Sequence, residues 1–355
     1  MESLGLKNIL KAFKDKKVFI TGHTGFKGSW LTYLLDKSGA KTKGYSLKPN
    51  TSPSLFDNLN LSQNHTSVYA DIKNYDFLKI EIQSFKPDFV FHLAAQALVL
   101  DSYSDPKETF EVNFNGTLNL LEVLRVLNFS CTAILITTDK VYENIELNKA
   151  FREIDKLGGK DPYSSSKAAC ELLIHSYNTS FFNKTNVKIA SVRAGNVIGG
   201  GDWSKNRLIP DIVRSIFENK DLDIRNPYST RPWQHVLEPI SGYLKLALLL
   251  DKNSNKYSGS WNFGPELDDV KSVNEIINLA KKFGIHFDLN VLKNKNKMEA
   301  KFLSLDIEKA KTELNWKPKW KTEKAILETF KWYQKFYAGE RVNELIDDNF
   351  NKFNE

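Results

Sequence analysis

The chain has 355 residues, 41% of them hydrophobic, and a formal net charge of +7 with a pI near 9.0. This length and composition allow the chain to bury a sizeable core, and they predict one large domain with a smaller lobe. A net positive charge of this size is typical either of a protein that binds polyanions or of a protein with a solvated, lysine-rich surface. We favour the second and expect no nucleic acid as a partner.

Cysteine usage and apolar runs limit the compartment. Cys131 and Cys170 are too few for a disulfide framework, so we expect buried free thiols in a reducing environment. The longest apolar runs, such as Leu244–Leu250, fall far short of the roughly 20 residues that a membrane span needs. Apolar residues at helical spacing near the chain start predict a short helix. We therefore expect a cytoplasmic protein without a membrane partner.

Strands and helices alternate through residues 1–193. Strands are predicted at 17–21, 41–46, 67–70, 89–93, 133–138 and 188–193, and helices at 29–37, 74–85, 106–127 and 163–181. This alternation predicts an α/β fold, a Rossmann-like doubly wound parallel sheet with helices on both faces.

The second half of the chain is more broken. Glycines at 199–201 and several prolines separate predicted helices at 209–219, 237–250, 272–283 and 322–336. We expect residues 194–355 to form mainly a smaller mixed lobe over the carboxyl ends of the strands, where such sheets hold their ligands. Segments near 234–264 are expected to return to the first domain.

Three glycines lie between the first predicted strand and the first predicted helix of the alternating part. Gly22, Gly25 and Gly28 would let the backbone approach a pyrophosphate at the N-terminus of that helix. Their G-x-x-G-x-x-G spacing differs from the usual G-x-G-x-x-G fingerprint, so a simple tight turn is the alternative. The position after the first strand favours a dinucleotide cradle.

The residues alone leave the choice between NAD and NADP open. No Asp or Glu lies between Lys37 and Phe56, where NAD sites often carry an acid for the adenosine ribose. Lys48 could accept a 2′-phosphate. Asp71 and Ile72 either flank the adenine or begin a helix.

A Tyr/Lys pair near the fifth strand carries the chemistry. The spacing Tyr-x-x-x-Lys occurs five times, but only Tyr163 opens a predicted helix soon after that strand. One turn places Lys167 on the same helix face, and its charge is expected to lower the phenol's pKa from about 10. Thr138 can bond the same substrate oxygen, and Asp139 and Lys140 follow it.

These motifs resemble the extended short-chain dehydrogenases/reductases along essentially the whole chain. The resemblance rests on the glycines, on the run from His92 to Ala95, on Asn113 and Thr138, and on Tyr163 with Lys167. Within that family, residues 23–31, 193–203 and 231–239 are similar to sugar-nucleotide 4,6-dehydratases. The resemblance implies a tightly held NAD, a nucleotide-sugar substrate and a role in deoxysugar biosynthesis, including that of lipopolysaccharide O-antigen.

The resemblance also assigns residues to each ligand. Those implied for the cofactor are Gly22, Thr24, Gly25, Phe26, Gly28, Asp71, Ile72, Leu93, Ala94, Ala95, Tyr163 and Lys167. Those implied for the nucleotide-sugar are Gln96, Asn196, Arg207, Arg231 and His235. Arginine forks suit a diphosphate, and Trp203 and Trp233 either stack on the nucleotide or belong to the core.

The implied reaction is an internal redox cycle. Tyr163 takes the C4′ hydroxyl proton while hydride leaves C4′, water is lost across C5′ and C6′, and the hydride returns to C6′. We assign Asp139 as the acid and Lys140 as the base of the water loss, where relatives carry Asp-Glu. These roles need a protonated carboxyl and a neutral amine, both favoured by desolvation. A solvated ion pair is the alternative for Lys140.

Some segments differ from the family pattern, and the sequence leaves two other functions open. Leu100-Asp101 and residues 145–149 differ from the family pattern near the sugar end, which leaves the sugar and the base unsettled. A nucleotide-sugar 4-epimerase would need no acid–base pair, and a non-catalytic dinucleotide or RNA-binding relative would suit pI 9.0. Surplus apolar residues on two helices predict a homodimer or homotetramer; they are Leu118, Leu120, Leu121, Val123, Leu124, Leu172, Leu173, Ile174 and Tyr177.

Overall fold

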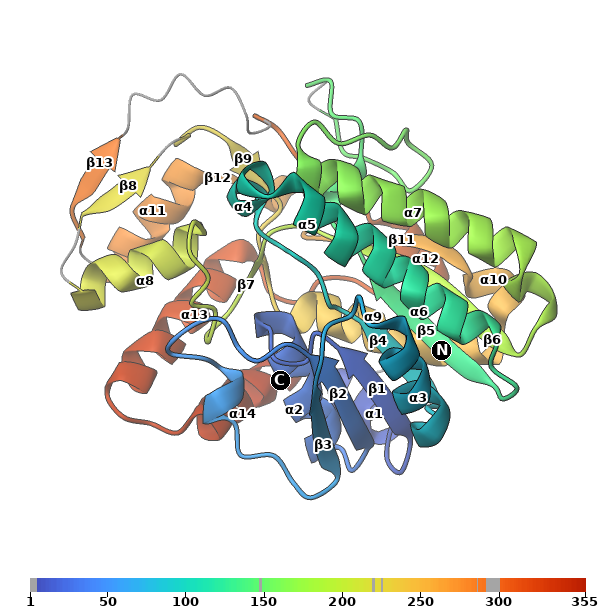
Figure 1. The fold of residues 1–355 in the computed structure, drawn as a ribbon. Coiled ribbons are helices and arrows are strands. Elements are labelled where there is room, and N and C mark those ends of the chain that lie inside the picture. The colour runs from blue at the N-terminus through green and yellow to red at the C-terminus, as the bar shows by residue number, and fades with distance from the viewer. Residues whose placement is uncertain (1–4, 147–148, 219–220, 225, 286, 292–300) are drawn as a thin grey trace.

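The computed structural model describes residues 5–146, 149–218, 221–224, 226–285, 287–291 and 301–355. Its centre is a seven-stranded sheet in the order β11-β6-β5-β4-β1-β2-β3, with every neighbouring pair parallel (Figure 1). The strands are β1 (Lys17–Thr21), β2 (Lys41–Ser46), β3 (His65–Tyr69), β4 (Phe89–His92), β5 (Cys131–Ile136), β6 (Val187–Ala194) and β11 (Gly259–Phe263). The predicted fold class is confirmed.

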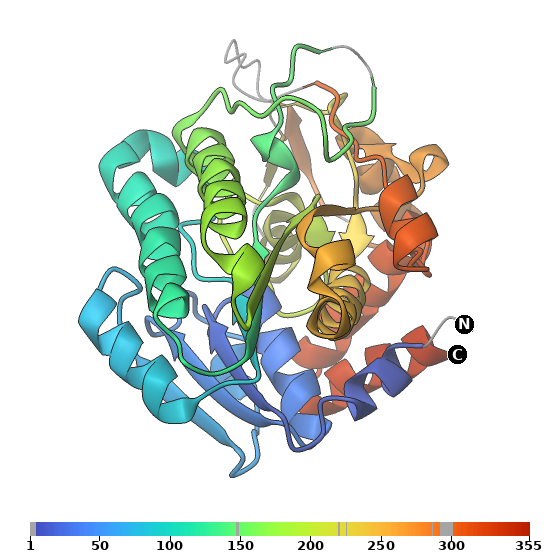
Figure 2. The ribbon, with the colours of Figure 1, turned by 90° about the vertical axis from the view of Figure 1, so that its right-hand side faces the viewer.

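Helices cover both faces of the sheet, which explains why the central strands β1, β4 and β5 are mostly apolar and buried. Val18 and Ile20 of β1 belong to a core that includes α1 (Leu6–Lys11), α2 (Phe26–Lys37) and α9 (Leu237–Lys252). Phe19, between them, faces the opposite core, made with α3 (Tyr75–Phe85), α6 (Gly116–Arg125) and α7 (Pro162–Ser180). Figure 2 shows these two layers with the sheet between them. Both cysteines are buried and free, as predicted.

A smaller group of elements lies beyond one end of the sheet (Figure 1). Its short strand pairs are β7 with β10, β9 with β12 and β8 with β13. These strands are β7 (Val197–Ile198), β8 (Leu222–Ile224), β9 (Thr230–Arg231), β10 (Gln234–His235), β12 (Lys271–Ser272) and β13 (Leu289–Val291). Besides α9, the helices of the second half are α8 (Leu208–Glu218), α10 (Ser254–Tyr257), α11 (Val273–Lys282), α12 (Glu308–Glu313), α13 (Thr322–Tyr337) and α14 (Val342–Asn354).

One predicted helix is divided. The range 106–127 consists of α5 (Pro106–Phe110), a π-helical turn at Glu111–Asn115 and α6, and α4 (Val99–Ser104) precedes it. The wide turn carries the buried Asn113, whose amide accepts from the Gln96 backbone N–H (2.9 Å) and donates to Ser166 Oγ (2.9 Å). Inward hydrogen bonding of one side chain accompanies the break in the regular helix.

Strand β5 ends earlier than predicted, at Ile136 instead of Thr138. Thr138 therefore belongs to the connection that follows the strand, at the sheet edge where ligands bind in folds of this kind. Among the described residues, no helix combines the length and apolar character that crossing a membrane requires.

Candidate active site

The glycine loop after β1 has the shape of a dinucleotide cradle. Gly22 has φ of 71°, and a Cβ there would lie 2.6 Å from the backbone nitrogen of Ala94. A Cβ on Gly28 would lie 2.1 Å from the Gly22 carbonyl oxygen. Gly25 caps α2 without a side-chain hydrogen bond, so the first N–H groups of the helix stay available to an anion. The loop therefore fits a pyrophosphate.

The neighbouring strand ends complete this cradle. After β4, the backbone N–H groups of Leu93 and Ala94 bond the carbonyl and hydroxyl of Thr21 (3.0 and 3.2 Å), which sets residues 93–95 against the loop. Thr24 Oγ1 lies 2.9 Å from both Ser46 Oγ and the Leu47 carbonyl oxygen at the end of β2. The hydroxyls of Thr24 and Ser46 therefore lie at the end of β2, where dinucleotide sites often carry an acid that binds the ribose.

Asp71 and Ile72 follow β3 in the same region. The Asp71 carboxylate accepts from the Lys73 N–H (2.9 Å), and its carbonyl accepts from the Tyr45 hydroxyl (3.1 Å). Ile72 is buried, and a Cβ on Gly116 would lie 2.7 Å from it. Helix α3 begins only at Tyr75 and is capped by the Asn74 side chain. Asp71 is therefore not the helix cap that the sequence allowed as the alternative.

Four chemically active side chains meet beside the start of α7. The Asp161 carboxylate caps this helix by accepting from the Ser164 N–H (2.9 Å), and Tyr163 follows in the first turn. Lys167, one turn on, donates to the Ile136 carbonyl at 3.3 Å. Thr138 and Tyr163 share a hydrogen bond. The predicted group of Thr138, Tyr163 and Lys167 is brought together.

Asp139 and Lys140 stand next to this group. The Asp139 carboxyl is 1% exposed, and one of its oxygens accepts from Thr138 Oγ1 at 3.0 Å. The other oxygen has no hydrogen-bond partner among the residues that the structure describes. Lys140 Nζ lies 3.7 Å from the bonded oxygen, and its side chain is 30% exposed. The geometry is that of a half-buried ion pair.

Burial dominates the ionisation of the Tyr/Lys pair. It raises the pKa of Tyr163 to about 12, against the Thr138 hydrogen bond and the Arg207 charge, which lower it. Burial also lowers the pKa of Lys167, although Cys170 and Glu171 raise it. The expectation that Lys167 holds the phenol's pKa below about 10 is therefore wrong for the protein alone, because desolvation of a phenolate outweighs the nearby cations.

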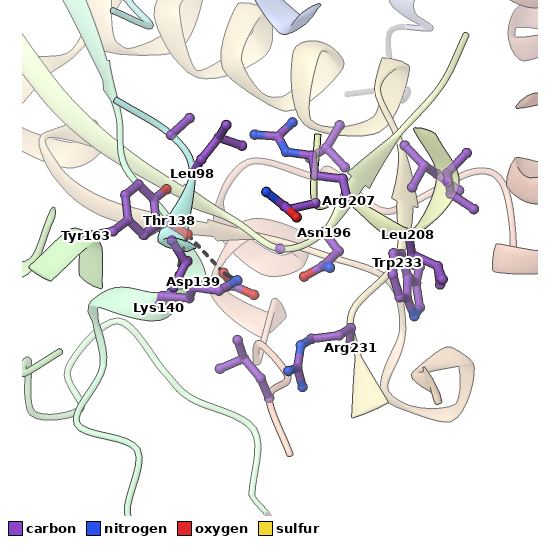
Figure 3. Close-up of a pocket in the computed structure, with 18 of the residues that line it drawn as sticks. Leu98, Thr138, Asp139, Lys140, Tyr163, Asn196, Arg207, Leu208, Arg231 and Trp233 are labelled. Carbon is purple, nitrogen blue, oxygen red and sulfur yellow. Dashed lines mark hydrogen bonds and ion pairs between the residues drawn. The ribbon is translucent and has the colours of Figure 1, made fainter. Parts of the chain in front are cut away.

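A cavity of about 360 Å³ opens in front of these residues, within the usual size range of small-molecule sites. In Figure 3, Tyr163, Thr138, Asp139 and Lys140 face Asn196, Arg207, Arg231 and Trp233 across it. Phe26 of the glycine loop also contributes to the wall. The cavity thus joins the end of the parallel sheet to the C-terminal elements.

Two residues predicted for the nucleotide-sugar do not line this cavity. The Gln96 amide donates to Thr109 Oγ1 and the Leu98 carbonyl, both at 3.0 Å, and so stabilises its own loop. His235 is fully buried between the rings of Trp30 and Trp320. Of the two tryptophans, Trp203 packs in the core, whereas Trp233 lines the cavity.

Sequence reasoning missed Lys27 and Asp202. Lys27 lines the cavity, and burial together with the charges of Arg207 and Lys167 lowers its pKa to about 8. Asp202 holds the Arg207 guanidinium at 3.0 Å and so orients it. Both residues lie in the segments 23–31 and 193–203 that carry the family resemblance, which was the only available signal.

Of the two segments that depart from the family pattern, the first lines the cavity through Leu100. Asn144, which directly precedes the second segment, also lines it, and its amide donates to the Phe302 carbonyl at 2.7 Å. Residues 147 and 148, part of the second departing segment, lie outside the described residues. The departure at Leu100 therefore concerns the wall of the cavity, not the Tyr163 group.

The site can move protons at neighbouring atoms of one ligand. A phenol, a hydroxyl, a buried carboxyl and an amine lie along one wall, and a dinucleotide cradle adjoins them. Cationic side chains lie on the opposite wall, as an anionic ligand requires.

The known proteins that this chain resembles are named for reactions of sugar nucleotides. Residues 19–329 match the family model described as GDP-mannose 4,6 dehydratase. The chain is 45% identical over 334 residues to the CDP-glucose 4,6-dehydratase of Salmonella typhimurium, covering 92% of this chain and 93% of that protein. It is 28% identical to the CDP-paratose 2-epimerase of Salmonella typhi, over 89% of this chain and 98% of that protein.

Solved structures share the fold. A UDP-glucuronic acid 4-epimerase from Bacillus cereus, in complex with UDP-glucuronic acid and NAD, is 26% identical with a TM-score of 0.78, covering 90% of this chain and all of that chain. A dTDP-glucose 4,6-dehydratase from Bacillus anthracis in complex with NAD is 23% identical with a TM-score of 0.76, covering 92% and 99%.

Three histidines around the site are buried and neutral. Burial lowers the pKa of His23, His92 and His235 to about 3 each. Both ring nitrogens of His92 lie within hydrogen-bond distance of threonine hydroxyls, at 2.7 Å from Thr21 and 3.1 Å from Thr117. Unfolding would restore the ordinary pKa near 6.5 to all three rings.

The unfolding free energy should therefore fall as the pH falls below about 6.5. In that range the unfolded chain binds protons that the folded chain refuses, so each ring contributes a slope of about 1.4 kcal/mol per pH unit, roughly 4 for the three. Urea unfolding between pH 7 and 5 measures this slope. His235→Phe, among aromatic neighbours, should lower it by about a third, and an unchanged slope would contradict the account.

Proposed function

The chain belongs to the GDP-mannose 4,6 dehydratase family of extended short-chain dehydrogenases/reductases, and from this premise we propose that it is an NAD-dependent CDP-glucose 4,6-dehydratase. The reaction converts CDP-D-glucose to CDP-4-keto-6-deoxy-D-glucose and water, so the enzyme is a hydro-lyase. The observation that carries the proposal is the buried Asp139 beside Thr138 and Tyr163, because water loss needs an acid that simple oxidation does not.

The cofactor is NAD, held by the glycine cradle and the strand ends beside it. The residues present fit it: the close approach at Gly22 and Gly28, and the open N-terminus of α2, receive a pyrophosphate. When bound, NAD supplies an acceptor for the C4′ hydride and then a donor for C6′. We assign residues 1–193, with 234–264, to the cofactor and mainly 194–355 to the nucleotide-sugar.

Tyr163 removes the proton of the C4′ hydroxyl. Its phenol is hydrogen-bonded to Thr138, which can hold the same substrate oxygen as the proton leaves. Lys167, from its position at the Ile136 carbonyl, supplies a positive charge that favours the phenolate form of Tyr163, which accepts this proton. The ketone formed at C4′ makes the C5′ hydrogen acidic.

Asp139 and Lys140 then carry out the water loss. Asp139 protonates the departing C6′ hydroxyl, and its unpaired, buried oxygen is the atom free to do so. Lys140, beside it, takes the C5′ proton. Lys140 returns this proton to C5′ when the hydride reaches C6′, and between turnovers Asp139 regains a proton from Tyr163 through the Thr138 hydroxyl, which contacts both side chains.

The opposite wall holds the nucleotide-sugar. Arg207, oriented by Asp202, and Arg231 face the cavity and suit the two phosphates. Asn196 has a buried side-chain oxygen without a hydrogen-bond partner among the described residues, so a ligand hydroxyl or amine can use it. Trp233 offers a ring face to the base or ribose.

The assembly is a homodimer or homotetramer formed through α5, α6 and α7, which lie side by side (Figures 1 and 2). The expected surplus of apolar residues is smaller than predicted, because Leu120, Leu121, Val123, Leu124 and Ile174 are buried within one chain. Apolar side chains still face outward from these helices. They are Phe110, Val126 beyond the end of α6, and Leu172.

Turnover of sugar nucleotides tests the function. Incubation with NAD and CDP-, dTDP-, GDP- or UDP-glucose should convert the CDP sugar to a product lighter by one water, without net reduction of NAD, as mass spectrometry would show. Conversion of a different nucleotide would make it another 4,6-dehydratase. A 4-epimer that keeps its C6′ oxygen would make it an epimerase, and tight RNA binding at physiological salt without turnover would favour a binding protein.

Substitution of the acid and of the base separates the steps. Asp139→Asn should keep oxidation at C4′ but slow water loss by about 10²- to 10⁴-fold, because the leaving hydroxyl lacks a proton donor. Lys140→Met should also lose exchange of the C5′ hydrogen with deuterated water, followed by NMR. Tyr75→Phe, which changes one of the chance Tyr/Lys pairs, is the control. Wild-type exchange in Lys140→Met would place the base elsewhere.

The mass in solution tests the assembly. Leu172 is 62% exposed on α7, so Leu172→Glu should convert the oligomer to a monomer by placing a charge in the contact. Leu267→Glu, at a position 56% exposed in the helical turn Leu267–Asp269, outside these helices, should leave the mass unchanged. Light scattering at micromolar concentration measures both, and a monomeric wild-type chain would refute the proposal.

A further inference from the structure

Glu171 is a buried carboxylate on α7, the helix that carries Tyr163 and Lys167. It lies on α7 one turn after Lys167, is 3% exposed, and forms an ion pair with Arg193 of β6 at 2.8 Å. Its oxygens also accept hydrogen bonds from the hydroxyls of Thr137 and Ser191. Although burial raises the pKa of this carboxyl, Arg193 and the two hydroxyls bring it below the ordinary value. Glu171 is therefore ionised.

Three successive turns of α7 contact three successive residues at the end of β5. Tyr163 meets Thr138, Lys167 donates to the Ile136 carbonyl, and Glu171 accepts from Thr137. We call this set the α7–β5 contact. Glu171 is the last of the three along α7, and its partner Thr137 also donates to the Val192 carbonyl at 3.2 Å. The position of Thr138 thus depends on the bond that its neighbour makes with Glu171.

The charges around Lys167 give Glu171 a second effect. Burial lowers the pKa of Lys167, and Cys170 and Glu171 on the same helix raise it. The other groups facing this lysine are His92 of β4, which is neutral, and Lys27 of α2, a cation. Glu171 is thus the carboxylate that acts on Lys167 from within its own helix, and Arg193 neutralises part of its charge.

The same ion pair extends to the wall of the cavity. Arg193 Nη1 donates to the Tyr142 hydroxyl at 2.7 Å and to the Glu153 carbonyl at 3.1 Å. Tyr142 lines the cavity and donates to Asn262 Oδ1 of β11 at 2.7 Å. Hydrogen bonds connect α7 across β6 to β11, although Arg193 Nε has no hydrogen-bond partner among the described residues.

We propose that Glu171 is a positioning residue for the dehydratase reaction, which holds Lys167 as an ammonium ion and sets Thr138 in register with Tyr163. This rests on the proposed function and adds a residue that never touches the ligands. Without the carboxylate, Lys167 would lose its proton at lower pH, and the phenol would lose its neighbouring positive charge in the same range.

The pH dependence of turnover tests this. Activity that needs the Lys167 ammonium declines as the pH rises through the lysine's pKa. In Glu171→Gln this alkaline limb of kcat should move down by about one pH unit, because a buried charge neighbour has been removed. Glu171→Asp, which keeps the charge, should leave the limb in place with a lower kcat. Ser191→Ala, which removes a neutral hydrogen bond to the same carboxylate, should not move it either.

The results that would contradict the role of Glu171 differ from those that would contradict the proposed dehydratase activity. A wild-type chain without CDP-glucose turnover contradicts the dehydratase itself. An active wild type whose Glu171→Gln variant is slower at every pH, with the alkaline limb unmoved, overturns the role of Glu171. If that variant fails to fold because Arg193 is left unpaired, Glu171→Gln combined with Arg193→Gln removes both charges. The limb should still move down, and an unmoved limb contradicts the proposal.

Discussion

The α7–β5 contact is the constraint on which the rest of the site depends. A helix repeats every 3.6 residues, so Tyr163, Lys167 and Glu171 project from one face of α7. That face is fixed against the end of β5 by bonds to Ile136 and Thr137. Since the strands are parallel, the end of β5 lies at the same sheet edge as the glycine loop after β1. The pair is thereby aimed at the ligand cleft.

Burial of this contact has an electrostatic cost that the surroundings offset only in part. The phenol's pKa is raised to about 12, and that of the Lys167 amine is lowered. Lys27 and Arg207 add positive charge around the cavity, and Asp202 balances that of Arg207 locally. Such a field stabilises a diphosphate and a phenolate alike, so one arrangement of charges serves binding and proton removal.

The sequence predicts those parts of the fold that depend on local patterns. The central strands β1, β4 and β5 are predictable because burial on both faces makes them mostly apolar runs. Tyr163 and Lys167 are predictable as a pair because positions i and i+4 adjoin on any helix. Contacts between distant segments were not predictable. Gln96 and His235 are polar residues in resembling segments, yet packing against Thr109 and Trp30 turns them away from the cavity. The division of helix 106–127 likewise depends on Asn113 bonding Gln96 and Ser166.

The central claim is that one phenol and its neighbours carry an internal redox cycle coupled to water loss. The most direct test is turnover of CDP-glucose deuterated at C4′, with the product analysed by NMR. The account predicts that the deuterium appears at C6′ of the 4-keto-6-deoxy product, because the hydride that leaves C4′ returns to the same sugar. Deuterium that stays at C4′, or that is lost to solvent, would contradict it.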